Sequence, residues 1–124
     1  MTDPKAYHCP VEAALDVIGG KWKPLILWWL SQRTYRFAEL RRAIPGITEK
    51  MLAKHLRELE ADAIVNREVH PTVPPKVEYS LTPYGRSLKH ALNAISAWGN
   101  AHIERTGALL LVPAGHPAAN RQSG

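Results

Sequence analysis

Two helical patterns joined by the four-residue turn Ile44-Pro45-Gly46-Ile47 occupy the middle of the chain. In the first pattern, Phe37, Leu40 and Ile44 recur at i, i+3 and i+7. The second pattern opens at Thr48, a favourable N-cap residue, and its apolar residues at i, i+4, i+7 and i+11 commit one face to a core. These residues are Leu52, Leu56, Leu59 and Ala63. Together the two patterns predict a helix-turn-helix.

Two segments with alternating apolar and polar residues follow, at residues 64–70 and 76–81. Such alternation predicts two strands. The connection between them, PTVPP, is rich in proline, which cannot pair regularly in a sheet. We therefore expect a β-hairpin with a stiff, protruding tip, the shape of a wing beside a helix-turn-helix.

Helical patterns also flank this central region. A short helix is expected from Pro10 to the Gly19-Gly20 pair, and a second from near Lys21 through the apolar run LILWWL, which we expect at the centre of the core. After the hairpin, Thr82-Pro83 predicts the start of one long helix of about 20 residues that ends near Gly107. The fold class is thus mainly α with a small β-hairpin wing (α+β), a winged helix-turn-helix. Because the last helix is too apolar to stand alone, we expect a homodimer through the terminal helices.

The length of 124 residues fits one compact domain. We divide the chain into an N-terminal arm at residues 1–8, the winged helix-turn-helix domain with its dimerisation helix at 9–107, and a tail at 108–124 that we expect to be partly disordered. The formal charge is +5, so a dimer would carry twice that, +10, which suits a polyanion such as DNA.

Cys9 is the single cysteine, which excludes an intrachain disulfide framework and a cysteine-based zinc site and favours the reducing cytoplasm. The N-terminus lacks the apolar run of a signal peptide, and the longest apolar run is too short to cross a bilayer. We expect a cytoplasmic protein, associated with the nucleoid when bound to DNA, with no membrane partner.

The candidate DNA-binding residues lie on the second helix of the helix-turn-helix. At about 100° per residue, Lys54 and Arg57 fall at about 40° and 340° from Lys50, while the apolar face centres near about 200°. An exposed basic stripe on this helix is where major-groove readout is expected. Thr48, Glu49 and Ala53 lie near its N-terminal end, and Glu49 could accept a hydrogen bond from cytosine.

Further basic residues are candidates for contacts to the DNA backbone. Arg36, Arg41 and Arg42 are expected on the preceding helix, and Arg67, His70 and Lys76 flank the tip of the wing. Arginine and lysine at such positions contact phosphates or enter the adjacent minor groove. The alternative for all these groups is an ordinary solvated surface, in which Glu58 and Glu60 pair with the basic stripe.

These segments, in this order, resemble the HxlR-type winged helix-turn-helix regulators, a bacterial group related in architecture to the MarR regulators. The residues that carry the resemblance are CPVEAALDVIGGKW from Cys9, then LIL, RFAELRRAIPGIT, KMLAKHLRELEAD, VPPKVEYSLTPYGRSL and AWG. The resemblance implies a cytoplasmic, homodimeric transcriptional regulator, commonly a repressor, that binds a two-fold symmetric operator in double-stranded DNA. Ala63 departs from the family pattern, which usually has glycine between the recognition helix and the wing.

Some members of this group use a cysteine just before the first helix as a sensor of oxidants or electrophiles, and Cys9 occupies the matching place. Cys9 also precedes Pro10 near a helix N-terminus, where the dipole and unpaired N–H groups favour a thiolate, and Lys5 and His8 add positive charge. A thiolate there could form an intersubunit disulfide or an adduct. The alternative is that Cys9 only packs in the dimer interface, with Glu12 opposing its ionisation.

Other functions find little support. The six histidines fall at no i, i+3 or i, i+4 spacing, so we predict no metal site and no cofactor. The chain has no nucleophile elbow, glycine-rich phosphate loop or paired acid and base residues, so we predict no enzyme. Two alternatives stay open: a winged-helix protein-interaction module without DNA binding, and a ligand-responsive regulator without a cysteine switch, in which tryptophans line a small pocket.

Overall fold

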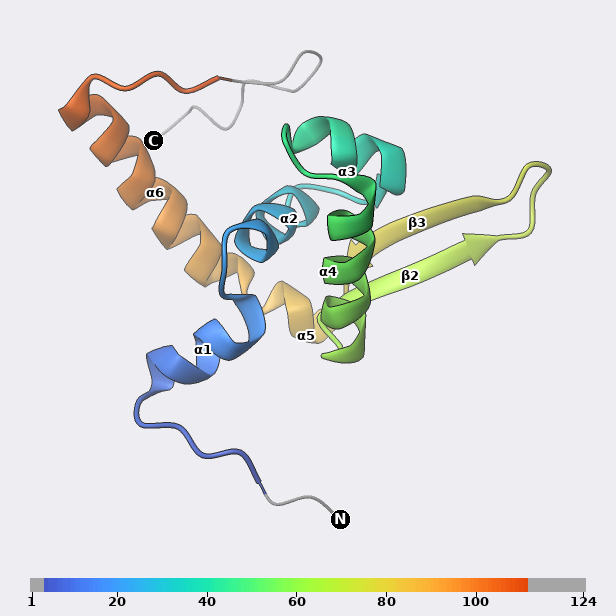
Figure 1. Cartoon of the computed structure of the whole chain (residues 1–124), viewed down its shortest axis with the longest axis horizontal. Coiled ribbons are helices and arrows are strands. Elements are labelled where there is room, and N and C mark those ends of the chain that lie inside the picture. The colour runs from blue at the N-terminus through green and yellow to red at the C-terminus, as the bar shows by residue number, and fades with distance from the viewer. Residues whose placement is uncertain (1–3, 112–124) are drawn as a thin grey trace. The chain divides into compact units, whose positions relative to one another are not determined.

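The computed structural model describes residues 4–111, which fall into two compact units, the first running to Lys89 and the second starting at His90. The elements in chain order are α1 (Pro10–Ile18), α2 (Trp22–Leu30), β1 (Tyr35–Arg36), α3 (Phe37–Ala43), α4 (Glu49–Ala61), β2 (Val65–His70), β3 (Lys76–Leu81), α5 (Pro83–Arg86) and α6 (Lys89–Thr106) (Figure 1). This order confirms a winged helix-turn-helix.

The core of the first unit is formed by one face each of α2, α3, α4 and the sheet. Ile26 and Leu27 of α2 and Leu40 of α3 are fully buried. The buried residues of α4 are Leu52, Leu56 and Leu59. Each such side chain contributes about 1.5–3 kcal/mol by leaving water. Leu25, on another side of α2, is 41% exposed, so α2 is buried on one side rather than all round as its composition suggested.

The turn between α3 and α4 is held by its sequence. Gly46 has φ of 93°, a left-handed conformation that side chains rarely adopt, and Pro45 precedes it, as in a type II turn. The Ile47 amide donates to the Ile44 carbonyl at 3.3 Å, and both isoleucines are buried. The Thr48 hydroxyl accepts from the Met51 amide at 3.1 Å, which confirms Thr48 as the N-cap of α4.

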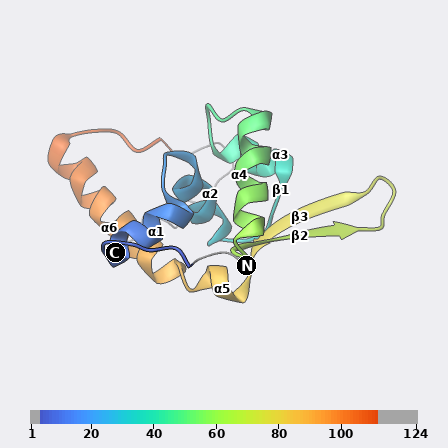
Figure 2. The same cartoon turned by 60° about the horizontal axis from the view of Figure 1, so that its bottom comes forward.

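The three strands form one antiparallel sheet in the order β1-β3-β2. The hairpin β2–β3 projects from the helices of its unit in both views (Figures 1 and 2). The short strand β1 was not predicted. Arg36, expected on a helix, lies in this strand and pairs with Glu78, so that expectation was wrong. Its amide donates to Glu39 Oε1 at 2.9 Å, which places Arg36 at the N-cap of α3 instead.

The end of α4 corrects a second expectation. The helix stops at Ala61, and Ala63, predicted on its buried face, is exposed and has φ of 62°. The Ile64 amide donates to the Leu59 carbonyl at 2.9 Å, so the chain reverses out of the helix through the left-handed residue. This geometry gives a physical reason for the glycine that the family pattern usually has here.

Replacing Ala63 with glycine should stabilise the protein by about 1 kcal/mol, because glycine adopts a positive φ without the clash between Cβ and the backbone. Urea unfolding of both proteins measures the difference. The matched control is Ala61→Gly, in the last helical residue of α4, which should lose stability. A loss of stability in Ala63→Gly would contradict the strain that we assign to this residue.

The predicted single helix from Pro83 to Gly107 was also wrong, because it is broken into α5 and α6. At the break, the Ser87 amide donates to the Tyr84 carbonyl at 3.1 Å and the Leu88 amide to the Gly85 carbonyl at 3.0 Å. These i to i−3 bonds tighten the chain in place of the α-helical pattern. The Arg86 side chain also donates to the Leu81 carbonyl at 3.1 Å, which fastens α5 to the end of β3.

The helix α6 carries exposed apolar side chains, with Ile95 61% and Trp98 69% exposed. Trp98 stacks on His102 at 5.1 Å between ring centroids. Leu109, Leu110 and Leu111 follow the helix and are exposed as well. The predicted tail continues at residues 112–124, which lie outside the described residues. Across residues 4–111, no helix is both long enough and apolar enough to cross a membrane.

Candidate nucleic-acid interface

The exposed face of α4 carries the predicted basic stripe. Lys50, Lys54 and Arg57 are exposed, while the apolar face of the same helix is buried. Among residues 4–111, no hydrogen bond or ion pair engages the side chain of Lys50 or Arg57. Both side chains can therefore meet a ligand without first breaking a hydrogen bond or ion pair within the described residues.

Lys54 differs from the other two because it pairs with Glu58 at 3.5 Å. Glu58 also pairs with Lys23 of α2 at 2.8 Å, and this hydrogen bond is the main cause that lowers the pKa of Glu58 to about 2. The carboxylate is therefore charged at neutral pH and links α4 to α2. The predicted pairing of the stripe with Glu58 is present for Lys54.

The turn and α3 add an arginine-lined hollow beside the start of α4. It has a volume of about 410 Å³, and Arg41, Arg42, Gly46 and Glu49 are among the residues that line it. Arg41 Nη1 lies 3.4 Å from Glu49 Oε2. The structure thus brings Arg41 and Arg42 next to the N-terminal end of α4, and it pairs Glu49 with Arg41 rather than leaving its carboxylate alone.

The register of the hairpin separates the predicted wing residues. In an antiparallel sheet, paired residues point to the same face. Arg67 pairs with Tyr79, on the face that carries the buried Val65, whereas Lys76 pairs with His70 on the other face. The structure therefore does not bring Arg67 and Lys76 together.

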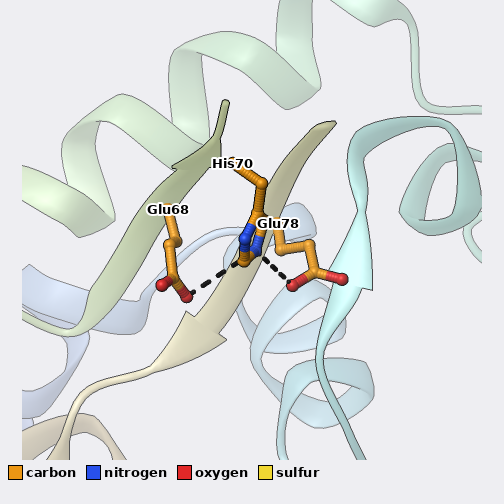
Figure 3. Close-up of side chains that lie close together, drawn as sticks. All are labelled: Glu68, His70 and Glu78. Carbon is orange, nitrogen blue, oxygen red and sulfur yellow. Dashed lines mark hydrogen bonds and ion pairs between the residues drawn. The ribbon is translucent and has the colours of Figure 1, made fainter. Parts of the chain in front are cut away.

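The face that holds Lys76 also carries two carboxylates. Glu68 and Glu78 pair directly across β2 and β3, and the His70 ring lies between their carboxylates (Figure 3). Lys76 Nζ is 3.8 Å from Glu78 Oε2, and Arg36 pairs with Glu78 from β1. The positive charge of Lys76 is therefore partly balanced at this face.

Cys9 is exposed and is the N-cap of α1. Its carbonyl accepts from the Glu12 amide at 3.1 Å, while its thiol makes no capping hydrogen bond to α1. The basic neighbours expected around it are engaged elsewhere. Lys5 pairs with Asp16 at 3.0 Å, and His8 Nδ1 lies 3.2 Å from Glu12 Oε1.

Asp16 fastens the N-terminal arm to α1. It accepts from the Tyr7 hydroxyl at 2.5 Å in addition to Lys5, and these two contacts lower the pKa of its carboxyl. The arm that precedes Cys9 is thereby held against the helix that follows it. No spacing in the sequence signals this contact, because Tyr7 lies in the arm and Asp16 in the helix.

Two groups of interacting residues were not predicted from the sequence. The link between Lys23 and Glu58 joins two elements, and only the i, i+4 spacing of Lys54 and Glu58 was visible in the sequence. The group formed by Glu68, His70 and Glu78 depends on the register of β2 and β3. A search for closely spaced histidines and cysteines could not find it.

A family model described as HxlR-like helix-turn-helix matches residues 17–107. The chain belongs to the HxlR-like helix-turn-helix family. The resemblance stated from the sequence is confirmed, and the match covers the elements that build the exposed face of α4. Members of this family are transcriptional regulators, and this HxlR-like chain is a DNA-binding regulator.

Individual relatives agree with the family. The HTH-type transcriptional regulator YtcD of Bacillus subtilis is 55% identical over 101 residues, which cover 82% of this chain and 80% of YtcD. The redox regulator HypR in its oxidised form is 54% identical with a TM-score of 0.72 over 75% of this chain and 96% of HypR. Diamide-treated YodB from B. subtilis is 38% identical with a TM-score of 0.64, over 77% and 96% of the two chains.

Proposed function

We propose that this chain is a homodimeric repressor that binds a two-fold symmetric DNA site in the cytoplasm, with α4 in the major groove. The observation that carries the proposal is the exposed stripe of Lys50, Lys54 and Arg57 on the second helix of a helix-turn-helix. Long basic side chains on this helix suit guanine edges and phosphates.

Each predicted site residue has a role in this arrangement. On α4, Lys50, Lys54 and Arg57 contact bases or phosphates, and Thr48, Glu49 and Ala53 lie near bases at the N-terminal end of the helix. Arg41 and Arg42, which line the hollow beside α4, contact phosphates. Arg67 and Lys76 contact phosphates from opposite faces of the wing, and Arg36 contributes charge next to Glu78.

Exposed apolar side chains on the terminal helices support the homodimer. On α1, Val11 is 64% and Leu15 59% exposed, and α6 exposes Ile95 and Trp98. Clusters of this kind on a small protein usually mark a protein interface. A closed two-fold dimer presents two copies of α4, so its DNA site is an inverted repeat.

Selection of duplexes from a random pool tests the dimer and its symmetry together. The selected sequences should contain an inverted repeat whose half-site centres lie about 10–10.5 base pairs apart, or a multiple of that spacing. Sedimentation of the complex should give two chains per duplex. A single, unrepeated motif bound by one chain would contradict the proposal.

We propose in addition that oxidants or electrophiles change the DNA affinity through Cys9. The thiol is exposed at the N-cap of α1, where α-helical N–H groups favour negative charge. Two thiols that lose two electrons and two protons to an oxidant form an intersubunit disulfide, whereas an electrophile forms a thioether adduct. The related HypR is a redox regulator, and YodB has a structure in a diamide-treated form.

Treatment with diamide should shift the affinity of the native protein for its selected DNA and leave Cys9→Ser unchanged. The measurement is fluorescence anisotropy before and after treatment, followed by reduction with dithiothreitol, which should restore the first value. Non-reducing electrophoresis separates a disulfide-linked dimer from an adduct. An equal shift in the DNA affinity of both proteins would show that Cys9 does not mediate the response.

A further inference from the structure

We propose that Glu68, His70 and Glu78 on the wing form a binding site for a divalent transition-metal ion, of which Zn²⁺ is the probe. Two carboxylate oxygens and one imidazole nitrogen from these residues lie within 4.8 Å of one another. Imidazole is a ligand that suits zinc and nickel, and carboxylate oxygens complete such sites. The spacing of the sequence does not bring these three residues together, and neither glutamate has a role in the DNA-binding surface.

The distances suit a shared ion. His70 Nε2 lies 2.8 Å from Glu78 Oε1 and 3.9 Å from Glu68 Oε1 (Figure 3). Ligand atoms bound to zinc at about 2.0–2.2 Å are about 3–3.5 Å apart in a tetrahedral or octahedral shell. The two measured distances bracket this range, so small rotations of the glutamate side chains bring all three atoms to one ion.

The register of the sheet supplies an independent reason for a cation here. Glu68 stands directly opposite Glu78, and like charges in this position destabilise a sheet. A neutral imidazole relieves this repulsion only in part, whereas a divalent ion cancels both charges. The backbone of the two strands fixes the pair, so the site does not need to be assembled from flexible loops.

The surroundings leave room for an ion and its water. The side chain of Glu68 is 62% exposed, and those of His70 and Glu78 are 30% and 28% exposed. Three protein ligands with an open side resemble a metal site that keeps water in its remaining positions. Two positive charges oppose binding: Lys76, at 3.8 Å from Glu78 Oε2, and Arg36, which stands opposite Glu78 on β1. Both have long side chains that can turn away.

A metal ion on this face would change the charge of the wing. It would neutralise the two carboxylates next to Lys76 and Arg36. The wing would then attract DNA phosphates more strongly. This consequence rests on the proposed function. The metal site itself does not, because it can be measured in the absence of DNA.

The test is a titration of the full, reduced chain with Zn²⁺ near neutral pH, followed by NMR of the histidine ring nuclei. The His70 signals, assigned by their loss in His70→Asn, should move and reach a plateau at one equivalent. In Glu68→Gln and Glu78→Gln the same shift should need about tenfold more zinc or greater. Glu68 is largely exposed, so Glu68→Gln should fold even where a change at Glu78 does not.

The matched control is His90→Asn, which removes an exposed histidine on α6 and should leave the His70 titration unchanged. Mg²⁺ should leave the His70 signals in place, because it prefers oxygen ligands. His70 signals that do not respond to zinc would overturn the proposal. So would an equal response in Glu68→Gln and the native protein, since the imidazole would then bind zinc alone.

Discussion

Replacing Arg57 with alanine should weaken binding to the selected DNA by about 5- to 150-fold, or about 1–3 kcal/mol, if Arg57 reads a base edge. Arg57 is exposed on the stripe of α4, and no hydrogen bond or ion pair among residues 4–111 holds its side chain. Its guanidinium is therefore free to donate to a guanine. Fluorescence anisotropy at a fixed salt concentration measures the loss.

The control for this substitution is Arg105→Ala, which removes the same charge in the last turn of α6. Its affinity for DNA should stay within about twofold of the native value, since Arg105 belongs neither to the helix-turn-helix nor to the wing. Base substitutions across the DNA site then locate the contact, because the affinity of Arg57→Ala should no longer depend on the base at one position. An affinity equal to that of the native protein would remove Arg57 from the interface.

Replacing Gly85 with alanine should destabilise the protein by about 1–3 kcal/mol or more. A Cβ atom at this position would meet the Ile64 carbonyl oxygen at 2.1 Å, far inside van der Waals contact. The atom in the way belongs to the backbone just before β2, so α5 must move away from the start of β2 to make room. The Arg86 bond to the Leu81 carbonyl would be lost with it.

Urea unfolding followed by circular dichroism measures the effect of Gly85→Ala. Ser87→Ala is the matched control, because Ser87 is exposed two residues away, and its substitution should stay within about 0.5 kcal/mol. A urea unfolding midpoint for Gly85→Ala within error of the native value would contradict the close contact between Gly85 and the Ile64 backbone.

The helix-turn-helix was predictable because its signals are local. Proline and glycine at Pro45-Gly46 specify a turn whose left-handed residue only glycine tolerates well, and the 3.6-residue period of α4 sets its buried and exposed faces. The same period predicted the stripe of Lys50, Lys54 and Arg57. The helical period of the sequence thus predicts which face of its own helix a side chain occupies.

The errors arose where the conformation depends on distant partners. Strand β1 has two residues and exists because Tyr35 and Arg36 pair with β3. Ala63 leaves the helical period because the chain must turn into β2, and the helix after Thr82 breaks where the chain follows the end of the sheet. No local propensity signals these events.

The faces of the wing could not be predicted from the sequence for a related reason. Arg67 and Lys76 are both close to the tip in sequence, but the register assigns them to opposite faces. The same register joins His70 to two glutamates, which a count of histidine and cysteine spacings does not include. Strand ends must be known to a single residue before the faces of a hairpin can be assigned.

The most direct test of DNA binding through α4 is fluorescence anisotropy of the reduced protein with DNA from upstream of its own gene and with a scrambled duplex of equal length, over a range of salt concentrations. We predict tighter binding to the upstream DNA and a linear fall of log K with log salt. The triple variant in which Lys50, Lys54 and Arg57 are alanine should lose both the preference and most of the salt dependence. A preference and a salt slope that survive intact in the triple variant would contradict the assignment of α4 as the reading helix.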